Sequence, residues 1–274
     1  MRALLCKRFH QPLLGVVLAS LLLFAGPGSV SASEASPYEL ETGRELALTG
    51  IGLGLAGTAW LLDRKADPLT AEQIQGFQRS SVPGVDRGAT RRWDPKAGKA
   101  SDILLGVTAL SPTAVILTDR GRKEPWTLGV MYLETVLLTN GAMALLKSAV
   151  SRTRPFVYND DPEIPLEKKM GKDAQRSFPS GHTANAFAGA VLLSTTYEAL
   201  YPGSDASGWI WATSLLAAST TGYLRYAAGK HFPTDIVAGA ALGVFVGWLV
   251  PELHEVDPAT NPGSPPLMTF SFRF

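Results

Sequence analysis

Six apolar segments, each long enough for a helix of several turns, place the strongest limit on how this chain can fold. Each is rich in Ala, Leu and Gly and is longer than an ordinary strand, which favours helices. Polar stretches separate the segments, which span residues 46–62, 103–117, 126–146, 182–200, 209–228 and 236–250. Apolar helix faces pack against other elements. We therefore predict an all-α fold, a compact helical bundle of about six apolar helices.

Several of these segments approach the ~20 residues that a helix needs to cross a membrane, but polar residues interrupt them. Glu134 and Asn140 lie in the third segment, and Asp102 precedes the second. Ionisable groups inside a membrane are rare unless they are functional. We therefore expect a domain of buried apolar helices that associates with a membrane, and at least one segment that does not span it.

The first 32 residues have the three parts of a secretory signal peptide. Basic residues occur among the first eight positions, residues 13–25 form a short apolar stretch, and small residues at 30–32 allow cleavage after Ala32. The alternative is an uncleaved anchor helix, for which the apolar stretch is short. We expect an exported protein, periplasmic or membrane-associated, with its active site on the periplasmic side.

Composition excludes several classes of protein. The net charge of +1, from 25 Lys+Arg and 24 Asp+Glu, argues against a nucleic-acid partner. An apolar fraction of 46% is too high for a disordered chain. Cys6 is the only cysteine and lies in the predicted signal peptide. The rest of the chain therefore has no disulfide, no zinc–thiolate site and no cysteine nucleophile.

The first of three motifs is a basic stretch at the end of the third segment. Lys147 and Arg154 are seven residues apart, which is two helical turns, so they can share one face of a helix. Pro155 disfavours helical geometry at Arg154, so the helix should end there. The alternative is a basic helix C-terminus that offsets the helix dipole.

The second motif, Phe178-Pro179-Ser180-Gly181-His182, opens the fourth segment. The backbone N–H groups at a helix start bind anions, and a histidine in the first turn would lie beside the anion. The alternative is an ordinary serine N-cap followed by a surface histidine.

The third motif contains Arg225, His231 and Asp235, with Pro233 at a position suited to the start of a helix. A carboxylate that accepts from one ring nitrogen of a histidine fixes the tautomer and leaves the other nitrogen free to attack. The alternative is a His–Asp pair that merely stabilises a turn.

Together the motifs bring three cations, an anion-binding helix start and two histidines to the ends of helices. Phosphoryl transfer requires neutralised phosphate oxygens, an in-line nucleophile and a proton for the leaving oxygen. The motifs supply all three, and no carboxylate cluster accompanies them. We therefore expect phosphoryl transfer at the helix ends, with no metal and no cofactor.

These residues resemble the type 2 phosphatidic acid phosphatase and vanadium haloperoxidase superfamily, whose pattern is K-x6-RP, PSGH and SR-x5-H-x3-D. The spacing matches in all three parts over roughly residues 100–250, and Leu224 replaces the usual serine before the arginine. The resemblance implies a compact helical bundle and no metal.

The resemblance also implies roles for eight residues. His231 would be the nucleophile that forms a phosphohistidine, and Asp235 would orient it. His182 would protonate the leaving oxygen and then activate water. The phosphate would be bound by Lys147, Arg154, Ser180, the Gly181 N–H and Arg225.

On this basis we divide the chain into four parts. A secretory signal peptide covers residues 1–32, and an N-terminal helix with a polar linker covers 33–99. A phosphatidic acid phosphatase type 2-like catalytic domain covers 100–251, and a C-terminal tail covers 252–274. The linker contains a capping box at Thr70 and Gln73, and the end of the tail alternates apolar and polar residues as a strand does.

The function expected from sequence is a metal-independent phosphatase that hydrolyses a phosphomonoester or pyrophosphate, with an envelope lipid as the favoured substrate. Its partner would be a phosphorylated lipid or a small phosphoester, and no oligomeric state is indicated. Three alternatives stay open: a periplasmic acid phosphatase for soluble substrates, a vanadium haloperoxidase, and a non-catalytic phospholipid binder.

Overall fold

The computed structural model describes residues 36–63 and 68–256. The predicted signal peptide, with Cys6, and the alternating residues at the end of the tail lie outside the described residues.

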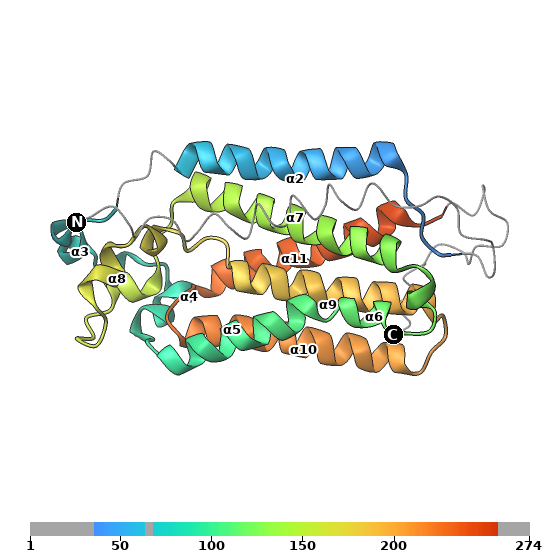
Figure 1. The fold of residues 1–274 in the computed structure, drawn as a ribbon. Coiled ribbons are helices and arrows are strands. Elements are labelled where there is room, and N and C mark those ends of the chain that lie inside the picture. Colours follow the sequence, from blue (N-terminus) through green and yellow to red (C-terminus); the bar gives the residue numbers. More distant parts are fainter. Residues whose placement is uncertain (1–35, 64–67, 257–274) are drawn as a thin grey trace, which may run out of the picture.

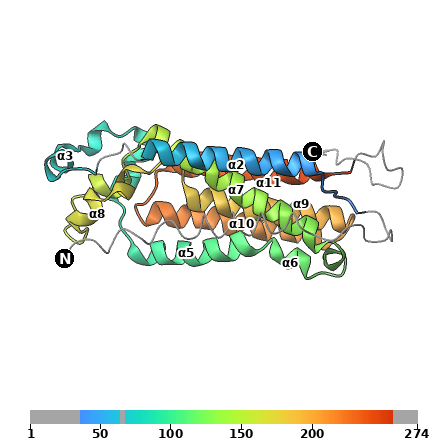
Figure 2. The same cartoon turned by 45° about the horizontal axis from the view of Figure 1, so that its top comes forward.

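Six long helices in the described part of the chain lie side by side, and successive ones run in opposite directions (Figures 1 and 2). They are α2 (Thr42–Asp63), α5 (Pro95–Leu110), α7 (Pro125–Val150), α9 (Gly181–Leu200), α10 (Ala206–Ala227) and α11 (Pro233–His254). Each corresponds to one of the six predicted segments. The described residues form no strand, and an isolated antiparallel bridge joins Tyr38 to Glu255. The prediction of an all-α bundle is confirmed.

Short helices between the long ones bring the total above six. They are α3 (Ala71–Gly76), α4 (Gly84–Arg87), α6 (Thr113–Ile116) and α8 (Leu166–Met170). Short 3-10 turns occupy Arg79–Ser81, Gly88–Arg91, Gly121–Lys123, Pro155–Tyr158 and Lys172–Gln175. The predicted capping box at Thr70 and Gln73 is present at the start of α3. The second predicted segment is divided into α5 and α6, because Pro112 has no backbone N–H to continue a helix.

Proline and capping residues set several helix ends. Asp94 caps α5, whose first residue is Pro95, and Pro233 is the first residue of α11, as predicted. The predicted boundaries at residues 99/100 and 251/252 fall inside these two helices.

The end of α7 differs from the sequence-based expectation. The helix stops at Val150, and Ser151 has a left-handed backbone with φ of 46°. Lys147 and Arg154 therefore do not share a helix face. Arg154 is extended, as the proline after it requires.

The backbones of α9 and α11 approach each other very closely. A Cβ atom on Gly243 would lie 2.2 Å from the carbonyl oxygen of Ala184, and one on Gly247 would lie 2.6 Å from that of Ala188. Any side chain at these positions would push the helices apart. Glycine is therefore required wherever α11 crosses the backbone of α9.

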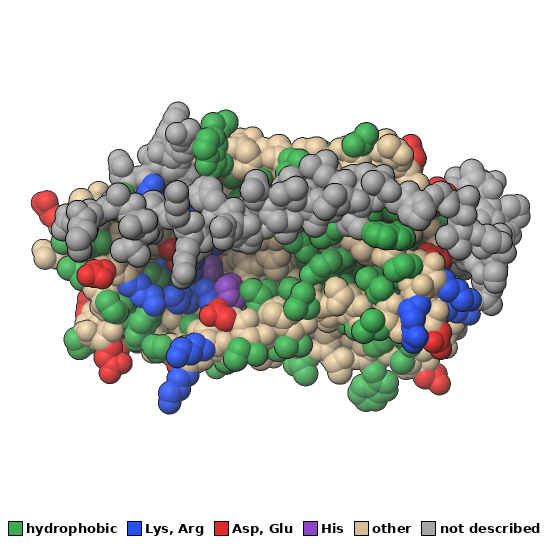
Figure 3. Space-filling view, in the orientation of Figure 1, with side chains coloured by type: hydrophobic (Ala, Val, Ile, Leu, Met, Phe, Trp, Pro, Cys, Tyr) green, Lys and Arg blue, Asp and Glu red, His purple; other side chains and the backbone are tan. Residues whose placement is uncertain are grey.

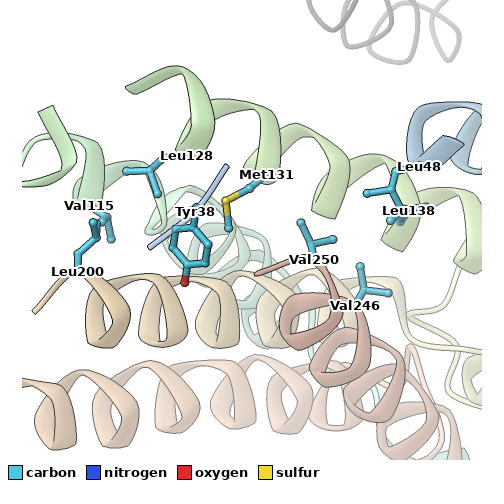
Figure 4. Packing of buried hydrophobic residues seen from close by; sticks show 9 residues of the cluster. All are labelled: Tyr38, Leu48, Val115, Leu128, Met131, Leu138, Leu200, Val246 and Val250. Atoms are coloured by element: carbon cyan, nitrogen blue, oxygen red, sulfur yellow. The ribbon is translucent and has the colours of Figure 1, made fainter. Parts of the chain in front are cut away.

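α9 is the central helix of the bundle. It packs against α5, α7, α10 and α11, whereas α2 packs on the outer side of α7. Apolar residues from α2, α6, α7, α9 and α11, together with Tyr38 ahead of α2, pack into a core cluster (Figure 4). They are Tyr38, Leu48, Val115, Leu128, Met131, Leu138, Leu200, Val246 and Val250.

The outer faces of the long helices are apolar. Large side chains such as Ile103, Trp209 and Val237 are 71%, 75% and 68% exposed. The expectation that the apolar helices are buried is therefore wrong for their outer faces. Four helical segments, 42–62, 95–116, 125–158 and 233–254, are long and apolar enough to cross a membrane. The structure supports membrane association.

The contact between α9 and α11 predicts the effect of a single methyl group. Gly243→Ala should destabilise the fold by about 1–3 kcal/mol or more, because its Cβ meets backbone atoms that cannot rotate away. Gly106→Ala in α5 is the control, since no atom lies within 4 Å of its Cβ position. Thermal unfolding of the detergent-solubilised variants measures both. Equal unfolding midpoints would contradict the close packing.

Candidate active site

The three motifs meet at one end of the bundle, where α7 and α10 end and α9 and α11 begin. Figure 3 shows Lys, Arg and His side chains gathered at this end, near α8. The structure thus brings together all eight residues singled out from the sequence: Lys147, Arg154, Ser180, Gly181, His182, Arg225, His231 and Asp235.

His231 lies at the centre of the site and is 1% exposed. Its Nδ1 is 2.7 Å from the carbonyl oxygen of Ser177, which can only accept, so Nδ1 carries a proton. Its Nε2 is 3.2 Å from Nη1 of Arg154, which can only donate. Burial, and then the positive charges of Arg154, Lys147 and Arg225, hold the pKa of His231 well below its usual range. The ring is therefore neutral, with a lone pair on Nε2.

Asp235 supports His231 indirectly, which differs from the predicted direct hydrogen bond. Its Oδ2 is 3.8 Å from Nδ1 of His231. That oxygen accepts instead from the Ser177 hydroxyl and from the Phe232 N–H, the latter at 2.9 Å. Asp235 is held at the first turn of α11 and reaches the ring through Ser177. Sequence reasoning missed Ser177.

An ion-pair network formed by Arg152 and Asp86 holds the second carboxylate oxygen of Asp235. Arg152 donates to Oδ1 of Asp235 through Nη1, and to Oδ2 of Asp86 through Nη2 at 2.7 Å. Asp86 also accepts from the backbone N–H and the hydroxyl of Thr234. Sequence reasoning missed both partners. Arg152 lies inside the first motif, which was a usable signal, whereas nothing local marks Asp86.

Arg154 is fixed by acceptors on its outer side. Its Nε donates to the carbonyl oxygen of Asp173 and its Nη2 to Oδ1 of Asp173, both at 2.8 Å. Its Nη1 also donates to the carbonyl oxygen of Lys230 at 3.1 Å. These bonds leave Nη1 directed toward His231. The polar insert between the first two motifs thus supplies the carboxylate that pairs with Arg154.

The start of α9 lies beside Lys147. Ser180 is the N-cap, and its hydroxyl contacts the Thr183 hydroxyl at 2.8 Å. A Cβ on Gly181 would be 2.2 Å from Sδ of Met143 and 3.8 Å from Nζ of Lys147. Gly181 therefore lets the Met143 side chain pack against the helix start, and Nζ of Lys147 lies close to the first turn, whose amides point out of the helix. The Ser180 hydroxyl is already occupied as a cap.

His182 and Arg225 share a carboxylate that sequence reasoning missed. Oδ1 of Asp102 is 2.7 Å from Nε2 of His182 and 3.3 Å from Nη1 of Arg225. Burial and the charge of Arg225 lower the pKa of His182 to about 4, against the opposite effect of Asp102. Nη1 of Arg225 also donates to the Ser101 hydroxyl at 3.2 Å. Leu224, which precedes Arg225, stands where the family pattern has a serine. The hydroxyl that contacts Arg225 here comes from Ser101 in α5.

This arrangement suits a tetrahedral oxyanion. Lys147, Arg154 and Arg225 surround a neutral His231, and the positive end of α9 adds N–H groups beside Lys147. Among the described residues, the group with metal-ligand spacing is Glu45, Glu134 and His254, which lies away from these motifs. The site itself offers no set of carboxylates for a metal.

Residues 128–257 match the family model described as PAP2 superfamily. This range includes all three motifs.

Several curated proteins are similar in sequence. An undecaprenyl-diphosphatase from Sulfolobus acidocaldarius is 28% identical over 57% of this chain and 66% of its own length. A lipid A 4'-phosphatase from Bacteroides thetaiotaomicron is 30% identical over 45% of this chain and 54% of its own length. A lipid A 1-phosphatase from Porphyromonas gingivalis is 40% identical over 47% of this chain and 25% of its own length. The alignments thus cover about two thirds or less of these relatives.

Solved structures show a more distant likeness. A PAP2-type phosphatidylglycerolphosphate phosphatase from Bacillus subtilis aligns with a TM-score of 0.40 and 20% identity, over 88% of this chain and 94% of that one. Aquifex aeolicus LpxE aligns with a TM-score of 0.34 and 18% identity, over 80% of this chain and 99% of that one.

The lowered pKa of His182 predicts a dependence of stability on pH. Between pH 6.5 and about 4, the unfolded chain binds a proton at this residue that the folded chain does not. Falling pH therefore favours unfolding across this window, and stability is regained above it. We expect His182→Gln to lose less stability than the wild type between these pH values, measured by thermal unfolding. Lys99→Gln, an exposed change in α5, should behave as the wild type. Identical pH dependence in His182→Gln and wild type would contradict the shift.

Proposed function

Residues 128–257 belong to the PAP2 superfamily, and from this premise we propose that the protein is a metal-independent phosphatase acting on a phosphomonoester or pyrophosphate of an envelope lipid. One observation carries the proposal. The neutral His231 has its Nδ1 proton held by Ser177 and its Nε2 lone pair beside Arg154, among three cations. A buried, oriented nucleophile next to cations is what phosphoryl transfer requires.

In the first step, Lys147, Arg154, Arg225 and the amides at the start of α9 bind the phosphate oxygens. Nε2 of His231 attacks phosphorus, a P–N bond forms and the P–O bond to the leaving group breaks. The electron pair leaves with that oxygen, which takes a proton from His182. Because the bound phosphate is negative, it raises the pKa of His182 and allows the ring to carry this proton.

In the second step, water replaces the histidine. His182, now neutral, takes a proton from the water as it attacks phosphorus. The P–N bond breaks and its electron pair returns to Nε2 of His231. Throughout, the proton stays on Nδ1 of His231 and is donated to the Ser177 carbonyl oxygen, and Asp235 holds Ser177 by accepting from its hydroxyl. The negative carboxylate behind Ser177 stabilises the positive charge on the phosphorylated ring.

The lipid nature of the substrate rests on two observations. The outer faces of the helices expose large apolar side chains along the bundle, which supports a site close to lipid. Several relatives are named for phosphorylated lipids, namely undecaprenyl diphosphate and lipid A. The predicted signal peptide supports export, with the active site on the periplasmic side.

Phosphate release from purified protein tests this function. The wild type should release phosphate from undecaprenyl diphosphate or lipid A in a short assay with EDTA, and vanadate should inhibit it. His231→Gln should lose at least about a thousandfold in kcat, because it removes the nucleophile. Lys99→Gln should keep the wild-type rate.

Other outcomes would replace the proposal. Equal turnover of p-nitrophenyl phosphate and lipid, with no gain from detergent micelles, would indicate a soluble-substrate phosphatase. Bromide oxidation with vanadate and peroxide would indicate a haloperoxidase. Absence of release from every substrate would leave a phospholipid binder.

The covalent step has its own test. p-Nitrophenolate leaves without needing a proton, so His182→Asn should still form the phosphohistidine from p-nitrophenyl phosphate but hydrolyse it slowly. Rapid quenching with radiolabelled substrate should then show acid-labile, base-stable label on His182→Asn and none on His231→Gln. Label that persists in His231→Gln would assign the nucleophile to another residue.

A further inference from the structure

Three buried ionisable side chains meet far from the phosphate site. They are Glu45 in α2, Glu134 in α7 and His254 in the last turn of α11, which are 2%, 3% and 0% exposed. Nε2 of His254 lies 3.0 Å from Oε2 of Glu45 and 3.2 Å from Oε2 of Glu134. α11 begins at the active site and is about 30 Å long, so phosphoryl transfer cannot use this cluster directly.

The outward-facing atoms of two of these residues are already bonded. Nδ1 of His254 donates to the carbonyl oxygen of Val250 at 2.7 Å, which fixes a proton on Nδ1. Oε1 of Glu45 accepts from the backbone N–H of Glu41 and from the Arg44 side chain, both at 3.0 Å. Nε2 of His254 and Oε2 of Glu45 are therefore left to face each other. Bonds of this kind orient the side chains that bind metals in proteins.

Glu134 completes the cluster, and its nearest donor is the one histidine nitrogen that Glu45 also contacts. Both of its carboxylate oxygens are fully buried, and neither makes a hydrogen bond of normal geometry, although Oε2 lies near Nε2 of His254. A single proton on Nε2 would serve one carboxylate, and Glu45 is the nearer. Burying a carboxylate whose oxygens accept no well-formed hydrogen bond is costly. A cation between the three side chains would accept a lone pair from each.

We propose that Glu45, Glu134 and His254 bind one divalent transition-metal ion. One imidazole nitrogen with carboxylate oxygens suits Zn²⁺, and Mn²⁺ more weakly. The three ligand atoms lie within 4.8 Å of one another. A small inward movement of these side chains would give the bond lengths of about 2.0–2.2 Å that Zn²⁺ makes to nitrogen and oxygen.

The ion would join α2 to α7 and α11. α2 lies outside the part of the chain that matches the family, and it packs mainly on α7. A shared ion would therefore fix α2 to the catalytic bundle. Its role is structural, and it is independent of the proposed phosphatase activity.

Metal analysis of the full-length protein in detergent tests this site. After prolonged dialysis against EDTA, loading with ZnCl₂ and desalting, the wild type should retain about one Zn²⁺ per chain, and loading should raise the unfolding midpoint by on the order of 5 °C. Because the ligands are buried, release to EDTA is slow compared with an enzyme assay. Glu134→Gln and Glu45→Gln should lose most of the bound zinc and the thermal response. Glu198→Gln in α9, whose carboxylate accepts from Trp211 at 2.9 Å, is the matched control and should keep both.

Three results would overturn the proposal. They are a wild type that retains no zinc after loading, a midpoint that zinc does not change, and zinc retained by both cluster variants. The first two would leave a histidine shared between two carboxylates, and the third would place the metal elsewhere. Glu134→Gln keeps the size of the side chain, and its own unfolding curve shows whether the variant folds.

Discussion

The site depends on the direct contact between the backbones of α9 and α11. Gly243 and Gly247 allow the two helices to touch, and near their N-terminal ends a Cβ on Gly239 would lie 2.5 Å from the carbonyl oxygen of Ser180. The Ser180 N–H also donates to the carbonyl oxygen of Asp235 at 2.9 Å. The start of α9, which can bind an anion, is therefore locked in position relative to the residues around His231. Phosphoryl transfer needs such a fixed distance between nucleophile and anion site.

The two arginines proposed to bind phosphate are each held by hydrogen-bond acceptors from other parts of the chain. Arg154 is held by Asp173, and Arg225 by Asp102 and Ser101. These bonds fix the guanidinium groups before any phosphate arrives, so little reorganisation is needed on binding. Arg152 has a different role, because its Nη1 and Nη2 both donate to carboxylates. Two arginines two residues apart therefore serve support and binding separately.

Much of the fold could be predicted from sequence because its signals are local. Apolar segments and prolines marked the long helices, and the three motifs brought together every residue proposed to react. Asp86, Asp102 and Ser177 could not be predicted, because their partners lie 54 to 148 residues away in the sequence and no periodic pattern links them. The exposed apolar faces were also missed, since an apolar residue looks the same in a sequence whether it meets protein or lipid. The early end of α7 was also missed, because a serine in the sequence does not indicate the left-handed backbone that Ser151 adopts.

The partners of the motif residues carry a consequence for how the chain can be divided. Every proposed reacting group lies within residues 128–257, yet Asp86, Ser101 and Asp102, which hold Arg152, Arg225 and His182, all precede that range. A fragment cut at residue 128 would keep the chemistry and lose three of the groups that position it. The start of the range that matches the family model is therefore not a structural boundary. The earlier helices and the matched range build the site together, so transplanting the motifs alone onto another scaffold would carry over the cations without the groups that hold them.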